Sequence, residues 1–122
     1  MERITEYLSH IRRTMKLHES LLKTICGRYG LTLVEAQVVS FLHNNPTKDT
    51  AGDIVELRML SKGNVSQAVE RLIQKSMLAR SPDAADRRKI HLRLLAASAP
   101  VTKEIDALQE QFHAAVFQGC LL

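Results

Sequence analysis

One segment of the 122-residue chain combines helical periodicity with an almost entirely polar surface. Between residues 62 and 75, Val65, Val69 and Leu72 recur at the three- and four-residue spacing of one buried helical face. The other face carries amide, hydroxyl and charged side chains, namely Asn64, Ser66, Gln67, Glu70, Arg71, Gln74 and Lys75. Because these groups offer many donors and acceptors, the face is suited to hydrogen bonding with a polar partner.

Basic charge is concentrated in the same region. Residues 58–93 contain nine basic and three acidic residues, a net charge of +6, whereas the rest of the chain has eight basic and ten acidic residues, a net charge of −2. Arg87 and Arg88 follow Asp86 in a stretch of turn-forming residues. A basic segment on a mildly acidic body predicts contact with a polyanion, although charge alone fits a solvated face equally well.

Other kinds of chemistry have little support. The chain contains no nucleophile elbow, no glycine-rich phosphate loop and no His-x-x-x-His pair, so we expect neither catalysis nor a cofactor nor a bound metal. Two cysteines are too few for a disulfide framework. No apolar run approaches the roughly 18 residues of a membrane helix, and the N-terminus lacks an apolar signal core. We therefore expect a cytoplasmic protein that makes no membrane contact.

The elements around the polar segment are predicted to be mainly helical, since hydrophobic residues make up 45% of the chain but aromatic residues only 4%. Apolar residues from Ile4 to Tyr29 alternate spacings of four and three, which predicts one long helix ended by Gly30 in a left-handed conformation. Thr32 and Glu35 have the spacing of a capping box for a second helix, which an Asn-Asn-Pro sequence ends.

A short helix over residues 51–58, capped by Thr50, precedes the polar helix, and two short helices joined by a tight turn are typical of a helix-turn-helix. The period then changes to two, which predicts a β-hairpin with a basic tip over residues 77–94. Its second strand should point Ile90, Leu92 and Leu94 inward and Lys89, His91 and Arg93 outward. A last amphipathic helix should begin between residues 96 and 101 and extend to about Phe117.

Together these motifs resemble the MarR family of transcriptional regulators from about Leu31 to Leu95. The resemblance is carried by Val65-Ser66-Gln67-Ala68-Val69-Glu70-Arg71-Leu72, by Leu78-Ala79-Arg80-Ser81-Pro82-Asp83 and by Asp86-Arg87-Arg88. It implies a mainly α fold with a small β-hairpin, in which a winged helix-turn-helix domain (31–95) lies between dimerisation helices (1–30 and 96–122). Relative to the family, Ser76 replaces a glycine, the connection after Leu94 differs, and the C-terminal helix is apparently truncated.

The resemblance implies a homodimer on double-stranded DNA, with the polar helix in the major groove of a pseudo-palindromic operator. Amide side chains can read adenine and arginine can read guanine, which suggests Gln67 and Asn64 for adenine and Arg71 for guanine or phosphate. Ser66 is expected to contact a base or a phosphate, and Lys62 a phosphate. The protein would then be a transcriptional regulator, and we expect a repressor rather than an activator.

The wing is expected to supply the second contact. Transferred residue by residue, the family motif makes Arg88 the best candidate for the minor groove, with Arg87 beside it. Asp86 would brace the turn or orient an arginine. A protein–protein interaction module without specific DNA binding is the alternative interpretation, which the basic segment disfavours.

Members of the family often respond to small phenolic or aromatic acids, oxidants or metals. The resemblance implies an effector pocket between the dimerisation helices and the winged domain, with walls that the sequence does not identify. Cys26 is a candidate redox switch, because Lys23 and Arg28 lie close enough in sequence to lower the pKa of its thiol.

Overall fold

The computed structural model describes residues 2–117 and consists of helices and one two-stranded sheet. In chain order the elements are α1 (Glu2–Tyr29), α2 (Leu33–Asn44), α3 (Ala51–Arg58), α4 (Lys62–Gln74), β1 (Leu78–Pro82), β2 (Ile90–Leu94), the 3-10 turn η1 (Ala96–Ser98) and α5 (Ala99–Phe117). The predicted mainly α winged helix-turn-helix is confirmed. The predicted C-terminal segment beyond residue 117, with Cys120, lies outside the described residues.

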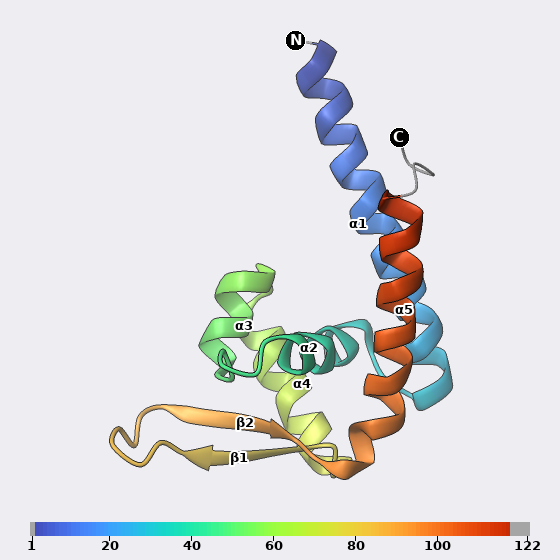
Figure 1. Ribbon diagram of the computed structural model, residues 1–122. Helices are drawn as coiled ribbons and strands as arrows, with labels where there is room; N and C mark the ends of the chain where they lie inside the picture. The colour runs from blue at the N-terminus through green and yellow to red at the C-terminus, as the bar shows by residue number, and fades with distance from the viewer. Residues whose placement is uncertain (1, 118–122) are drawn as a thin grey trace.

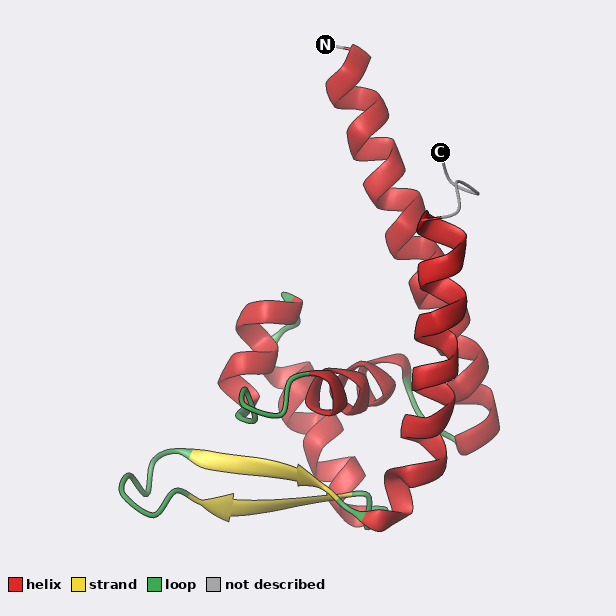
Figure 2. Cartoon of the chain, in the orientation of Figure 1, coloured by secondary structure: helices red, strands yellow, loops and turns green. Residues whose placement is uncertain are grey.

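Helices α1 and α5 lie side by side as a long stalk, and α2, α3, α4 and the hairpin pack beside its lower part (Figure 1). The N-terminal half of α1 extends beyond α5, while the hairpin projects sideways from the helices (Figure 2). Strands β1 and β2 pair antiparallel, from Leu78 opposite Leu94 at the base to Pro82 opposite Ile90 near the tip. Among the described helices, none is long and apolar enough to cross a membrane.

Local capping residues fix the helix boundaries. Gly30 has φ +64°, the predicted left-handed conformation, and Ser76 has φ 59° at the position where the resemblance implied a glycine. The Thr32 hydroxyl accepts the Glu35 backbone N–H at 3.2 Å and donates to the Glu35 carboxylate at 2.9 Å, so the predicted capping pair forms, with that carboxylate buried. A complete capping box forms at the start of α3, where Thr50 is the N-cap residue.

The hydrophobic core lies where α2, α4 and the base of the hairpin meet α5 and the C-terminal half of α1. Its largest fully buried apolar side chains are Leu22, Ile54, Leu72, Leu78 and Ile105, which come from five different elements. The long apolar repeat of α1 is buried only in its C-terminal half. The N-terminal half leaves Ile4, Tyr7, Leu8, Ile11 and Met15 exposed.

The predicted alternation of β2 is correct only at its base. Leu92 is buried and Leu94 is partly buried, but Ile90 is 38% exposed. Ile90 lies at the end of β2 nearest the wing loop, beside the first residues of α3, and it does not belong to the hydrophobic core. His91, which was expected to point outward, is instead half-buried between two aspartates. Helix α5 begins at Ala99, directly after η1.

Candidate nucleic-acid interface

Helix α4 is held in place by its apolar stripe and presents its polar face to solvent. Val65 and Leu72 are completely buried, and the helix packs mainly on α2 and α3. Met59 has φ 54° in the tight turn after α3, and the Ser61 hydroxyl caps α4 by accepting the Asn64 N–H at 3.1 Å. The predicted contact residues on this helix are all exposed: Lys62, Asn64, Ser66, Gln67 and Arg71.

A buried carboxylate fixes the C-terminal end of α4. Glu35 is 1% exposed, and its carboxylate accepts hydrogen bonds from Lys75 Nζ at 2.6 Å and from the Thr32 hydroxyl at 2.9 Å. Burial alone would raise the pKa of Glu35, but the bonds from Lys75 and Thr32 hold that pKa below its ordinary value. Lys75 Nζ also donates to the Gly30 carbonyl oxygen at 2.9 Å, so one side chain joins α4 to the end of α1.

Arg71 lies at the edge of the exposed face that is nearest to α2. Its guanidinium is 3.9 Å from the Glu35 carboxylate, and its side chain is about half exposed. On the neighbouring part of the face, Glu70 pairs with Arg80 of β1, which ties the helix to the hairpin. These two pairs link residues that are 36 and ten positions apart, so no local spacing in the sequence indicated them.

The loop of residues 83–89, here called the wing loop, is organised by two aspartates. The Asp83 carboxylate accepts the backbone N–H groups of Ala85 at 3.0 Å and Asp86 at 2.9 Å. Asp86 Oδ1 in turn accepts the Arg88 backbone N–H at 3.0 Å and lies 3.5 Å from Arg88 Nε. The Arg88 side chain remains 94% exposed, and Arg87 is exposed beside it. Asp86 therefore has the geometry that a bracing role requires.

His91 connects the wing loop to the helix-turn-helix. Its Nε2 lies 2.6 Å from Asp83 Oδ1, and its Nδ1 lies 2.8 Å from Asp49 Oδ1 in the loop between α2 and α3. The bonds to Asp83 and Asp49 raise the pKa of His91. The bond from His91, with the two backbone N–H groups, lowers the pKa of Asp83 to about 2. No sequence signal indicated this contact, because alternation placed His91 on the solvent side.

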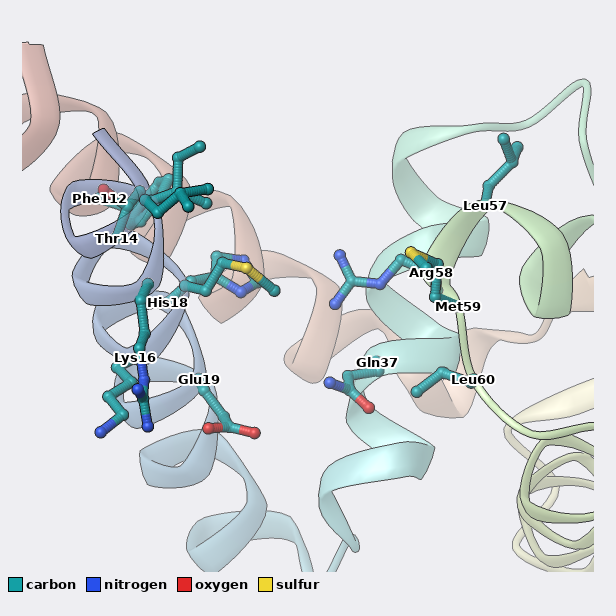
Figure 3. Close-up of a pocket in the computed structure, with 14 residues that line it drawn as sticks. Thr14, Lys16, His18, Glu19, Gln37, Leu57, Arg58, Met59, Leu60 and Phe112 are labelled. Atoms are coloured by element: carbon teal, nitrogen blue, oxygen red, sulfur yellow. The ribbon is translucent and has the colours of Figure 1, made fainter. Parts of the chain in front are cut away.

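A hollow of about 690 Å³ lies between α1 and the turn that joins α3 to α4. Its walls are mainly apolar, and in Figure 3 His18 of α1 and Arg58 of α3 face each other across it. The His18 ring meets the edge of Phe112 at a centroid distance of 5.1 Å. Burial and the nearby Arg58 charge lower the pKa of His18. The hollow lies where the resemblance implied an effector pocket.

The surroundings of Cys26 differ from those expected of a reactive thiol. The residue is half-buried, and its Sγ donates to the Thr32 carbonyl oxygen at 3.5 Å. Burial, reinforced by the Glu35 charge, raises the pKa of the thiol. The expected lowering is therefore wrong, because desolvation outweighs the charge of Lys23. Within residues 2–117, no group of three or more His, Cys, Asp or Glu residues is placed to hold a metal ion.

The exposed polar helix, the arginine-bearing wing and the supporting helices define a winged helix-turn-helix DNA-binding regulator. The MarR family model matches residues 29–89, half of the chain, and the protein therefore belongs to the MarR family. Members of this family are DNA-binding transcriptional regulators rather than enzymes. A search of curated proteins found no match.

Solved structures share the fold. Bordetella bronchiseptica BpsR, described for regulation of its DNA binding by 6-hydroxynicotinic acid, is 26% identical over 89% of this chain and 77% of its own, with a TM-score of 0.64. A MarR-family regulator from Silicibacter pomeroyi is 20% identical over 89% and 73%, with a TM-score of 0.73. A single-residue mutant of S. aureus MepR, bound to an oligodeoxyribonucleotide, is 15% identical over 93% and 83%, with a TM-score of 0.67.

Proposed function

We propose that the protein is a homodimeric repressor that binds a pseudo-palindromic operator, with α4 in the major groove and the wing loop in the minor groove. The observation that carries this proposal is the pairing of an exposed polar face on α4 with an almost fully exposed Arg88 on a braced turn. An α-helix fits the major groove, and the negative potential of a narrow minor groove attracts arginine.

The position of each polar residue on α4 determines the part of the DNA that it contacts. Gln67 and Asn64, which lie in the N-terminal half, read adenine edges, and Ser66 contacts a base or a phosphate. Lys62 contacts a phosphate at the helix start. Arg71 reaches guanine or phosphate from the edge of the face, where the Glu35 carboxylate limits its range of orientations.

The apolar surface of α1 supports the homodimer. Ile4, Leu8 and Met15 are each more than half exposed, although they belong to the same repeat that is buried further along the helix. An exposed apolar stripe of this length is typical of an interface between proteins. A second copy that covers the stripe would also place a second α4 on the DNA, as a two-fold symmetric operator requires.

The hollow between α1 and the α3–α4 turn supports a small aromatic acid as the effector. Its volume is within the usual range for ligand sites, which is about 300–1,000 Å³. Leu8, Ile11 and Leu60 offer apolar walls to a ring, and the Arg58 guanidinium offers a partner for a carboxylate. BpsR, whose DNA binding is regulated by 6-hydroxynicotinic acid, provides a precedent in a relative.

The decisive experiment is selection of bound sequences from a random DNA library. We expect enrichment of a two-fold symmetric site, with an affinity that falls steeply as salt concentration rises. In fluorescence anisotropy at fixed salt, Gln67→Ala combined with Arg71→Ala should weaken binding about tenfold or more, because each base contact contributes discrimination. Arg88→Ala should also weaken it. Lys103→Ala, which removes an exposed charge from α5, is the control.

If no sequence is enriched, the operator proposal is wrong, and if the double variant binds as well as wild type, the groove assignment is wrong.

The effector proposal is tested separately by adding benzoate or its neutral analogue benzamide to the protein–DNA complex. Benzoate should release DNA and benzamide should not, because only the carboxylate can pair with Arg58. A reporter gene behind the enriched site should be expressed less when the protein is present; higher expression would contradict repression.

A further inference from the structure

The position of His91 between two carboxylates requires a doubly protonated ring. Nδ1 and Nε2 each lie within 2.8 Å of an aspartate oxygen, and an ionised carboxylate can only accept hydrogen bonds. Both ring nitrogens must therefore donate. We propose that His91 is a positioning residue for DNA binding, whose protonated ring clamps the wing loop to the helix-turn-helix so that DNA affinity falls when the ring loses a proton. This inference rests on the proposed role of the wing in DNA binding.

The charge state of Asp83 supports the doubly protonated ring. Its carboxylate accepts bonds from the Ala85 and Asp86 backbone N–H groups as well as from His91. Three donors stabilise the ionised form, and the pKa of Asp83 is about 2. A protonated Asp83 therefore does not replace the imidazolium as the donor near neutral pH.

Other charged groups near the ring do not replace either contact. Arg93, on the same strand, and His43, on α2, line a surface pocket with His91 that is separate from the hollow beside α1. His43 Nε2 is engaged elsewhere, 2.8 Å from Asp106 of α5. On the paired strand, the residue opposite His91 is the uncharged Ser81. The two aspartates are thus the groups that hold the ring.

A short series of hydrogen bonds connects the ring to the wing arginine. Asp83 joins His91 to the Asp86 backbone N–H, and the Asp86 carboxylate holds Arg88. A neutral ring can donate to only one of its two carboxylates. Because the Leu92 N–H also bonds the Asp49 carbonyl oxygen at 2.8 Å, β2 stays attached to Asp49 in either state. Loss of the proton from either nitrogen therefore ends the bridge between Asp49 and Asp83, so the ring no longer clamps the wing loop, with the turn that presents Arg88, to the helix-turn-helix.

The clamp is tested first without DNA, by following the His91 ring signals with pH by NMR. We expect His91 to titrate above the ordinary imidazole value of about 6.5. Asp49→Asn and Asp83→Asn should each lower its pKa, because each removes one negative partner. His43→Gln, which removes another histidine paired with an aspartate, should leave it unchanged. A His91 ring that titrates at or below the ordinary value would overturn the clamp.

The link to DNA is tested by anisotropy on a duplex carrying the selected site, at fixed salt between about pH 5.5 and 9. As the pH rises and His91 loses its proton, wild type and His43→Gln should lose about fivefold to tenfold in DNA affinity. His91→Gln should not show this pH-dependent loss. Parallel profiles for wild type and His91→Gln would overturn this inference while leaving DNA binding intact. Absence of binding by wild type at every pH would instead overturn the proposed function.

Discussion

The winged helix-turn-helix and the N-terminal half of α1 expose apolar side chains to very different extents. Ile54 and Leu72, in the two helices of the helix-turn-helix, are completely buried. Tyr7 and Leu8, in α1, are 66% and 58% exposed. Both regions have helical apolar periodicity, so the sequence pattern alone does not distinguish them. They differ because several elements pack around the first region, whereas the N-terminal half of α1 extends beyond α5 (Figure 1).

This difference separates residues that stabilise the fold of one chain from residues available to a second chain. The winged part buries core side chains such as Ile54 and Leu72 within one chain, and its buried Glu35 carboxylate is paired with Lys75. The exposed half of α1 buries little within the chain, so its apolar residues contribute little to the stability of the isolated fold. Substitutions in the two regions should consequently affect different measurements.

The largest effect is expected in the core of the winged part. Leu72→Ala should lower the free energy of unfolding by about 3 kcal/mol, because it removes buried methyl groups and leaves a cavity. Urea denaturation measures this change. Met59→Ala, at a side chain that is 90% exposed, is the control and should change stability by less than about 0.5 kcal/mol. Equal losses in the two variants would contradict the assignment of the core.

The next effect concerns association rather than folding. Leu8→Glu should weaken the homodimer by about 2 kcal/mol, or about 30-fold, because a charged group would be buried where an apolar contact was lost. Sedimentation across micromolar concentrations measures the change. Ile90→Glu substitutes an exposed apolar residue of β2 that does not line the hollow beside α1, and it should leave the dimer intact. If both variants dissociate equally, the α1 stripe is not the interface.

The elements predicted best are those whose signals lie within a few residues. The period of 3.6 located the helices, and Thr50 and Gly30 marked the start of α3 and the end of α1. The polar face of α4 was likewise predictable, because burial of Val65 and Leu72 fixes which side chains point outward. For the same reason, every predicted contact residue on α4 is exposed.

The contacts that were missed join residues distant in sequence. Glu35 was predicted only as the capping partner of Thr32, whereas Lys75, 40 positions later, also bonds its carboxylate. His91 looks like an outward strand residue until the fold places Asp49 next to it. Ile90 fails for a related reason, since alternation shows which residues share a face but not how far the core extends beneath the strand.

A smaller effect is expected at Glu35, where the winged part meets the end of α1. Glu35→Gln should cost about 1–2 kcal/mol, because the ion pair with the partly exposed Lys75 ammonium is replaced by a weaker bond to a neutral amide oxygen. The pKa of Glu35 is lower in the folded protein than in the unfolded chain, where it is about 4.3. The ionised carboxylate therefore stabilises the fold above that pH, and this stabilisation is lost as pH falls through the folded pKa. In urea denaturation, the free energy of unfolding should therefore fall less steeply from neutral to acid pH for Glu35→Gln than for wild type. Glu70→Gln, at the exposed pair with Arg80, should change stability little.

The smallest effects are expected at two positions with left-handed backbone, Gly30 between α1 and the winged part and Ser76 within the winged part. Gly30, at the end of α1, has φ +64° and open space around its Cα, so Gly30→Ala should destabilise by about 1 kcal/mol through backbone strain alone. Ser76, at the start of the wing, has φ 59°, so Ser76→Gly should stabilise by about 0.5–1 kcal/mol. Ser66→Gly, inside α4, is the matched control and should destabilise, because helical backbone disfavours glycine. Thermal unfolding that moved in the same direction for Ser76→Gly and Ser66→Gly would contradict the strain assigned to Ser76.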